Sequence, residues 1–214
     1  MNIFTDKNVA RDYDAYYTSE QGKTVDDIEK QAIIEFMKPV MPGRMLEVGC
    51  GTGHWTELFS RMGFRVTATD VSQAMMAYTK NKSLPGVTFS EADVLNLPFP
   101  DNHFDQVATV TALEFCGDIQ QAFSEMRRVL KSGGWLIAGC LNADSMLGKT
   151  KNSDPVFRHA KMMTRSELKN HLETIGIPVI HECVFFSPEF ELLDHTGREN
   201  TVAGAFMAAA VQKK

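Results

Sequence analysis

The stretch EVGCGTGHW, residues 47–55, decides how the rest of the chain is interpreted. It overlaps the end of the apolar run RMLEV, which predicts a short buried strand, and it leads into the helical pattern TELFSRM. Glycines at this place let backbone amides approach a ligand closely. The three glycines of the stretch are Gly49, Gly51 and Gly53. We therefore predict a strand, loop and helix with a ligand crevice at the end of the strand.

Strand and helix patterns alternate along most of the chain. The further strand patterns are RVTATDV, VTFSEADV, FDQVATVTAL, WLIAGCL, VIHECVFF and AFMAAAV, and the helix patterns include TVDDIEKQAIIEFMK, SQAMMAYTKN, DIQQAFSEMRRVLK and TRSELKNHLETIG. This alternation is typical of a parallel sheet covered on both faces. The predicted fold class is α/β: a Rossmann-like, doubly wound, mostly parallel seven-stranded sheet with helices on both faces.

The same patterns predict one domain over residues 1–214. We expect an N-terminal helical cap in residues 1–40, a cofactor-binding core in 44–141, and a substrate loop with closing strands in 142–214. Within the last part, residues 143–163 form a polar, irregular stretch of the kind that often makes lids or binding segments. Thr24 and Asp27 stand in capping-box positions for the first long helix. Gly133 and Gly134 suit a helix stop.

Composition excludes several classes of protein. A net charge of −5 argues against a surface built for nucleic acid, because such surfaces need an excess of Lys and Arg. No apolar run approaches the roughly 20 residues that span a bilayer, and the N-terminus lacks a leader pattern, so we expect a cytoplasmic protein with no membrane span. The cysteines and histidines show no metal-ligand or disulfide spacing, so we expect no metal.

The ligand chemistry follows from two acidic residues and the glycine spacing. Asp70 closes the second predicted strand about twenty residues after the loop, where a carboxylate can accept ribose hydroxyls. Dinucleotide loops read G-x-G-x-x-G, whereas this loop reads E-x-G-x-G-x-G. Glu47 would repel a diphosphate and would favour a cationic amino-acid group. S-adenosylmethionine (SAM) carries an ammonium and a sulfonium and no phosphate, so it suits this loop.

Four motifs in order and spacing carry a family resemblance. They are LEVGCGTG, TATDVSQAMM, EADVLNLPFPDNHFDQV and ALEFCGDIQQAFSEMRRVLKSGGWLIAG. Over roughly residues 44 to 141 the chain resembles the class I SAM-dependent methyltransferases, in the branch with many small-molecule and quinone-biosynthesis enzymes. The resemblance implies SAM as methyl donor, S-adenosylhomocysteine as product, and an enzyme that transfers methyl groups.

The resemblance also implies residue roles. Glu47, Gly49 and Gly51 would line the methionine end of SAM, with Cys50 and Gly53 in the same loop. Asp70 would hold the ribose, and the adenine would lie among Val71, Ser72, Met75, Asp93 and Val94. Thr111 to Leu113 would pass beneath the sulfonium, and Tyr17 belongs to an aromatic segment that would fold over the cofactor. Glu114, at the mouth of the site, is the candidate catalytic residue.

Each role has a structural alternative. The glycines could form a turn without a ligand, Asp70 could cap a helix, Asp93 could be a turn residue, and Glu114 could form a surface pair. At the level of function, a SAM-binding accessory or sensor protein and a nicotinamide oxidoreductase are the alternatives, the second disfavoured by the glycine spacing. The expected acceptor is a small molecule, bound by a monomer or homodimer without nucleic acid; the sequence does not identify it.

Overall fold

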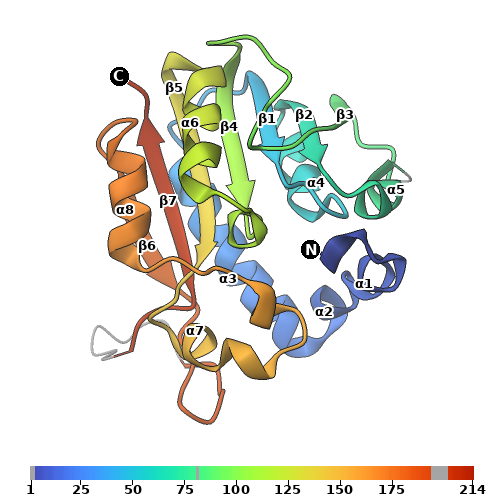
Figure 1. Cartoon of the computed structure of the whole chain (residues 1–214), viewed down its shortest axis with the longest axis vertical. Helices are drawn as coiled ribbons and strands as arrows, with labels where there is room; N and C mark the ends of the chain where they lie inside the picture. The colour runs from blue at the N-terminus through green and yellow to red at the C-terminus, as the bar shows by residue number, and fades with distance from the viewer. Residues whose placement is uncertain (1–2, 81, 194–201) are drawn as a thin grey trace.

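The computed structural model describes residues 3–80, 82–193 and 202–214, and its centre is a seven-stranded sheet in the order β3-β2-β1-β4-β5-β7-β6 (Figure 1). The strands are β1 Arg44–Val48, β2 Arg65–Asp70, β3 Val87–Glu91, β4 Phe104–Val110, β5 Leu130–Leu141, β6 Val179–Cys183 and β7 Phe206–Gln212. Neighbours pair in parallel except β7, which runs antiparallel to both β5 and β6. The predicted fold class is confirmed.

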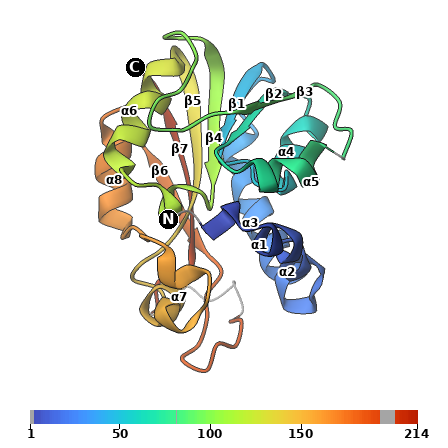
Figure 2. The same ribbon diagram turned by 45° about the vertical axis from the view of Figure 1, so that its right-hand side comes forward.

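Helices cover the sheet and gather at one of its edges. They are α1 Lys7–Asp12, α2 Ala15–Thr18, α3 Glu20–Met37, α4 His54–Arg61, α5 Gln73–Lys80, α6 Ile119–Val129, α7 Met146–Thr150 and α8 Arg165–Glu173. The order of the sheet reverses between β1 and β4, which places a crevice at their carboxyl ends. Figures 1 and 2 show α1, α2 and α7 near this edge. Within the described ranges, no helix is long and apolar enough to cross a membrane.

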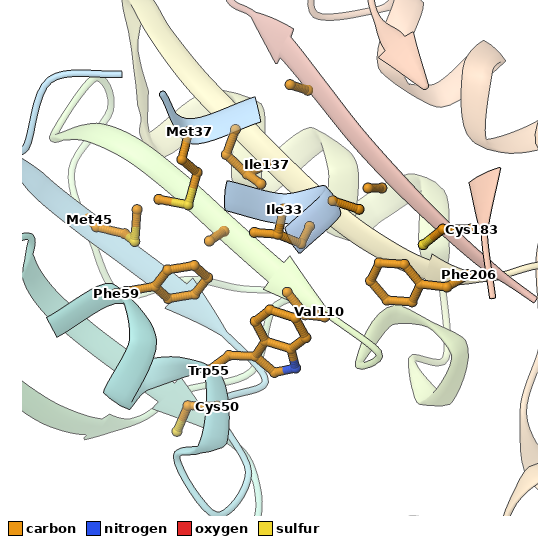
Figure 3. Packing of buried hydrophobic residues seen from close by; sticks show 14 of the residues in the cluster. Ile33, Met37, Met45, Cys50, Trp55, Phe59, Val110, Ile137, Cys183 and Phe206 are labelled. Carbon is orange, nitrogen blue, oxygen red and sulfur yellow. The ribbon is translucent and has the colours of Figure 1, made fainter. Parts of the chain in front are cut away.

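The strands are apolar on both faces, so the sheet divides the core into two layers. Met45 belongs to the layer under α3 and α4, whereas the next residue, Leu46, belongs to the layer under α6 and α8. Successive side chains of a strand point to opposite faces, which explains this split. Figure 3 shows the first layer, where Ile33 of α3 lies among side chains of the strands and Phe59 of α4. Both faces are therefore unavailable for ligands, and the carboxyl edge remains.

Three boundaries differ from the predictions. The first long helix begins at Glu20, capped by Ser19, and Thr24 lies inside it, so the predicted capping box with Asp27 is wrong. Gly133, with φ of +77°, does not end a helix, because α6 already ends at Val129 and β5 includes the glycine. The 143–163 segment is not fully irregular, since it contains α7 and short 3-10 turns. The start of α3 is set locally, by the hydrogen bond from the Gly22 amide to the Ser19 hydroxyl.

We predict that Ile33→Ala lowers the free energy of unfolding by about 2 to 5 kcal/mol. Ile33 is fully buried between α3 and the sheet, so its truncation leaves a cavity. Chemical denaturation measures the loss. Ile177→Ala is the matched control, because Ile177 is 77% exposed and its truncation should change stability by less than about 0.5 kcal/mol. Equal losses in the two variants would contradict the packing described for α3.

Candidate functional site

The end of β2 holds the glycine loop in place. The amides of Gly49 and Cys50 both donate to the carbonyl oxygen of Thr69, at 2.8 and 2.9 Å. The amide of Gly51 donates to Asp70 Oδ2 at 2.9 Å. All five residues of β1 pair with residues of β2, so the loop is attached to a hydrogen-bonded part of the sheet. The loop is therefore a preformed cradle at the crevice.

Two of the glycines are required by space as well as by backbone conformation. Gly49 has φ of +72°, and a Cβ there would lie 2.3 Å from Ala112 Cβ. Gly53 has φ of +81°, and its Cβ would lie 2.2 Å from Thr79 Cγ2. L side chains rarely adopt such positive φ values. A side chain at either position would push the loop away from α5 or from the end of β4.

Asp70 connects the loop to the following helix. While Oδ2 accepts from Gly51, Oδ1 accepts from the amide of Ser72 at 2.7 Å. Burial raises the pKa of Asp70, although the amide hydrogen bonds oppose this shift. Each carboxylate oxygen has a further acceptor position, and the residue lines the crevice. Asp70 can thus organise the loop and accept ligand hydroxyls at the same time.

A cavity of about 250 Å³, here called the inner pocket, lies against the loop. It brings together most of the predicted site residues. Those that line it are Tyr17, Gly49, Cys50, Gly51, Asp70, Val71, Met75, Asp93, Val94, Thr111 and Leu113. Val71 lines the pocket and is 43% exposed, so its side chain is available to cover a flat ring. Their predicted individual roles stay predictions.

Four predicted site residues do not line the inner pocket. Gly53 precedes α4 as its N-cap. Ser72 is fully buried; its hydroxyl accepts from the amide of Met75 and donates to the carbonyl oxygen of Phe4 at 2.6 Å. Both therefore support the pocket from behind. Glu47 and Glu114, the two acidic residues, are also covered.

Glu47 is buried beneath the loop. Its side chain is 3% exposed, and Oε2 has no hydrogen-bond partner among the described residues. Burial, with the nearby charge of Asp70, raises the pKa of Glu47 to about 8. An unsatisfied buried carboxylate oxygen is costly unless a donor or cation approaches it. The ammonium of SAM has the right chemistry, so the donor set fits this cofactor.

Glu114 lies under the crevice and lines neither cavity. It is fully buried, Oε1 accepts from the amide of Leu141 at 2.6 Å, and Oε2 has no partner among the described residues. Burial raises the pKa of Glu114 to about 7. The residue was expected at the mouth of the site, and the structure places its carboxylate behind the wall instead. A catalytic role for it stays a prediction.

An aromatic wall, formed by Phe4, Tyr13, Tyr17 and Phe115, lines part of the inner pocket. The Phe4 ring meets those of Phe115 and Tyr13 edge-on, with centroids 4.7 and 6.0 Å apart, and Tyr13 meets Tyr17 at 5.9 Å. Tyr17 in turn stacks on His54 at 3.9 Å. The tyrosine cluster RDYDAYY indicated this segment, but nothing in the sequence indicated Phe4 or Phe115. Their contact joins positions more than a hundred residues apart, which local patterns do not encode.

Side-chain contacts fasten the N-terminal helices to the glycine loop. Thr52 Oγ1 donates to Asp14 Oδ1 at 2.5 Å. His54 Nε2 lies 2.7 Å from Asp26 Oδ1, and Asp26 Oδ2 pairs with Lys30 at 2.6 Å. The pKa of Asp26 is lowered, because these two partners outweigh the effect of burial. The cap is therefore a fitted cover over the inner pocket.

A second cavity of about 1090 Å³, here called the outer cavity, lies on the other side of the aromatic wall. Phe4, Tyr13, Tyr17, Thr111 and Phe115 line both cavities. Further walls come from α3, from the segment 143–163 and from the residues after β6. Thr111 has φ of +48°, a strained conformation for a β-branched residue and one that often marks a functional position. The two cavities meet at this strained residue.

Comparison with known proteins supports one family. Residues 46–138 match the family described as methyltransferase domain. Over 121 residues the chain is 31% identical to the malonyl-[acyl-carrier protein] O-methyltransferase of Erwinia pyrifoliae. This alignment covers 54% of this chain and 44% of that enzyme. The chain carries a methyltransferase domain of the SAM-dependent kind. Proteins of this kind are enzymes, and their methyl donor is SAM.

The full length of this methyltransferase also has relatives. An uncharacterized protein of Methanocaldococcus jannaschii is 29% identical and is aligned over 100% of both chains. A SAM-dependent methyltransferase of Thermotoga maritima, described as a possible histamine N-methyltransferase, has a TM-score of 0.74 at 22% identity, covering 98% of this chain and 99% of that one. The second likeness shows a common fold. The chain spans less than half of the malonyl-[acyl-carrier protein] enzyme, so that enzyme's acceptor does not transfer.

We predict that Glu47→Gln changes how the stability of the ligand-free methyltransferase depends on pH. The folded pKa of about 8 exceeds the ordinary value, so between about pH 4.5 and 8 the folded protein holds a proton that the unfolded chain releases. The wild type should therefore lose stability as pH rises through this window, by at most about 1.4 kcal/mol per pH unit from this group. The variant lacks this titratable group, so the difference in free energy of unfolding between the variant and the wild type should shift in favour of the variant as pH rises.

Denaturation at a series of pH values measures the difference between the two proteins. Glu173→Gln is the control, because Glu173 is exposed on α8 and its neutralisation should leave the pH profile close to that of the wild type. A constant difference between Glu47→Gln and the wild type from pH 5 to 8 would refute the proposed burial of a neutral carboxyl group.

Proposed function

We propose that this protein transfers the methyl group of SAM to a small molecule that binds in the outer cavity. The observation that carries the proposal is the arrangement of the two cavities, which share the aromatic wall and Thr111. A donor in the inner pocket and an acceptor in the outer cavity would meet at this shared boundary. The size of the outer cavity, at the upper end of the usual range for ligand pockets, suits a small molecule.

We assign the donor's parts to residues by their chemistry. Asp70 accepts the ribose hydroxyls, Val71 and Met75 enclose the adenine, and the carboxylate of Glu47 offsets the ammonium from beneath the loop. The sulfonium of bound SAM supplies a methyl carbon that a nucleophile takes while the carbon–sulfur electron pair stays on sulfur. The inner pocket, with a volume of about 250 Å³, would hold this carbon in position for attack, and such positioning is worth roughly 7 to 11 kcal/mol.

The cap contributes by excluding water. Its helices are held to the loop through Thr52 and His54, and the aromatic wall covers part of the donor's pocket. An acceptor of low reactivity then meets the methyl group without competition from solvent. In this arrangement the protein mainly binds and orients, and a base is needed only for an acceptor that arrives protonated.

We predict that Asp70→Ala weakens binding of SAM and of S-adenosylhomocysteine by roughly 100-fold or more. The variant loses two charge-assisted acceptors for the ribose and releases the loop amide of Gly51, and hydrogen bonds to charged groups contribute about 1.5 to 3 kcal/mol each. Calorimetric titration measures the affinities. Asp27→Ala, on the exposed face of α3, should bind like the wild type.

NADH serves as the competing ligand in the same titrations. Binding of NADH as tight as that of SAM would favour the oxidoreductase alternative. Tight SAM binding without any S-adenosylhomocysteine formed over a broad panel of amine, hydroxyl, thiol and carboxyl acceptors would favour a SAM-binding accessory protein.

For Glu114, the buried position predicts a small effect on the chemical step. Glu114→Gln keeps an oxygen to accept from the amide of Leu141, and the side chain reaches neither cavity. We expect kcat to stay within about threefold of the wild type, measured as methyl transfer to the acceptor found in the panel. A fall of roughly 100-fold or more at unchanged SAM affinity would instead identify Glu114 as a general base.

A further inference from the structure

One stripe of α3 faces the outer cavity. Gln21, Val25 and Glu29 follow each other at intervals of four residues, and all three line the cavity. Side chains at this spacing lie on the same face of a helix. The carboxylate of Glu29 is thereby placed on a wall otherwise rich in aromatic and aliphatic groups.

Glu29 has no protein partner within the described part of the chain. Among the described residues, no hydrogen bond or ion pair involves its carboxylate, and the neighbouring Lys30 is paired with Asp26 instead. The other carboxylates of the cavity differ in this respect. Asp154 accepts from two backbone amides, at 2.7 and 2.8 Å, and Asp6 caps α1. Glu29 is thus the acidic side chain that is left without a role in the fold.

The surroundings of Glu29 disfavour its own charge and favour a cation. The side chain keeps some accessible surface where it lines the cavity, yet protein atoms surround it otherwise. Burial, followed by the charges of Asp26 and Glu114, raises the pKa of Glu29 to about 8, and Lys30 offsets this only in part. A cationic ligand would relieve both the burial and the repulsion, whereas an anionic ligand would add to the repulsion.

Aromatic rings complete the arrangement. Tyr13, Tyr16 and Tyr17 line the same cavity, and the charge of Glu29 acts on all three. Aromatic faces attract cations, and the attraction is stronger when water is excluded. Because Tyr13 and Tyr17 also line the inner pocket, a group bound here lies next to the donor.

We propose that the methyl acceptor is an organic amine with an apolar body, and that Glu29 and the surrounding tyrosines bind its cationic nitrogen. The ammonium then gives one proton to the carboxylate of Glu29. The nitrogen lone pair freed in this way attacks the methyl carbon, while the carbon–sulfur electron pair stays on sulfur. The inference rests on the proposed function, since it names the acceptor class of the same site. Arg158 and His159 are exposed and line the outer cavity, but neither contributes to the pKa shift of Glu29. The basic groups of the cavity therefore do not neutralise its carboxylate. The apolar part of the acceptor would lie against residues such as Phe157, Phe186 and Val184.

The test compares matched pairs of probes that differ only in charge. Phenethylamine, tryptamine and hexylamine are titrated into the protein saturated with S-adenosylhomocysteine, alongside 2-phenylethanol, tryptophol and hexanol. At pH 8.5 the amines are still cations, because alkylammonium groups have a pKa of roughly 10. We expect at least one amine to bind about tenfold or more tightly than its alcohol. Equal binding within every pair, or no binding of any amine, would overturn the proposal.

Variants at Glu29 separate this charge recognition from simple packing. Glu29→Gln keeps the shape and removes the charge, so it should abolish the preference for the amine while leaving S-adenosylhomocysteine affinity unchanged. Glu29→Asp should keep part of the preference. Glu35→Gln, an exposed position on the same helix, should behave like the wild type. A preference that persists in Glu29→Gln would refute the role of Glu29, and failure of S-adenosylhomocysteine to bind the wild type would refute the proposed function instead.

Discussion

The hydrogen bonds between the glycine loop and the end of β2 are the constraint on which the rest of the site depends. They hold Gly49, Cys50 and Gly51 against Thr69 and Asp70, so the loop has one conformation before any ligand arrives. That conformation leaves no room for side chains where the loop faces Ala112 and α5. The preformed loop spares the binding of SAM the entropy cost of ordering a flexible segment.

Buried carboxylates distinguish this site from a neutral pocket. Glu47, Glu29 and Glu114 come from three different elements, and burial raises the pKa of each, to about 8, 8 and 7. Only Glu114 has a backbone partner for one oxygen in the described structure. Uncompensated buried acids are costly to a fold and are retained where a ligand supplies the opposite charge. In the proposed function, bound SAM would supply an ammonium for Glu47, and an amine acceptor would supply one for Glu29.

The cap links cofactor binding to acceptor binding. One run of rings, from Phe115 through Phe4 and Tyr13 to Tyr17, forms a wall of both cavities, and Tyr17 continues it to His54 on α4. A donor that packs against the inner side of this wall therefore orders the surface that the acceptor meets. In the proposed function the core around the glycine loop would carry the donor, while the cap and the segments after β5 and β6, which line the outer cavity, would shape the acceptor's site.

The sequence by itself determined the fold class, the glycine loop and Asp70, because periodicity and loop spacing act over a few residues and repeat in every unit of the sheet. It also indicated the aromatic cap through Tyr17. Only the tertiary structure decided that Glu114 is covered and that Phe4 reaches the inner pocket. It also placed Glu29, an ordinary charged position within a helix pattern, inside a cavity. The positions of these three residues depend on contacts between segments far apart in the chain. A local pattern indicates which face of a helix or strand is buried, but it does not indicate which segment packs against that face.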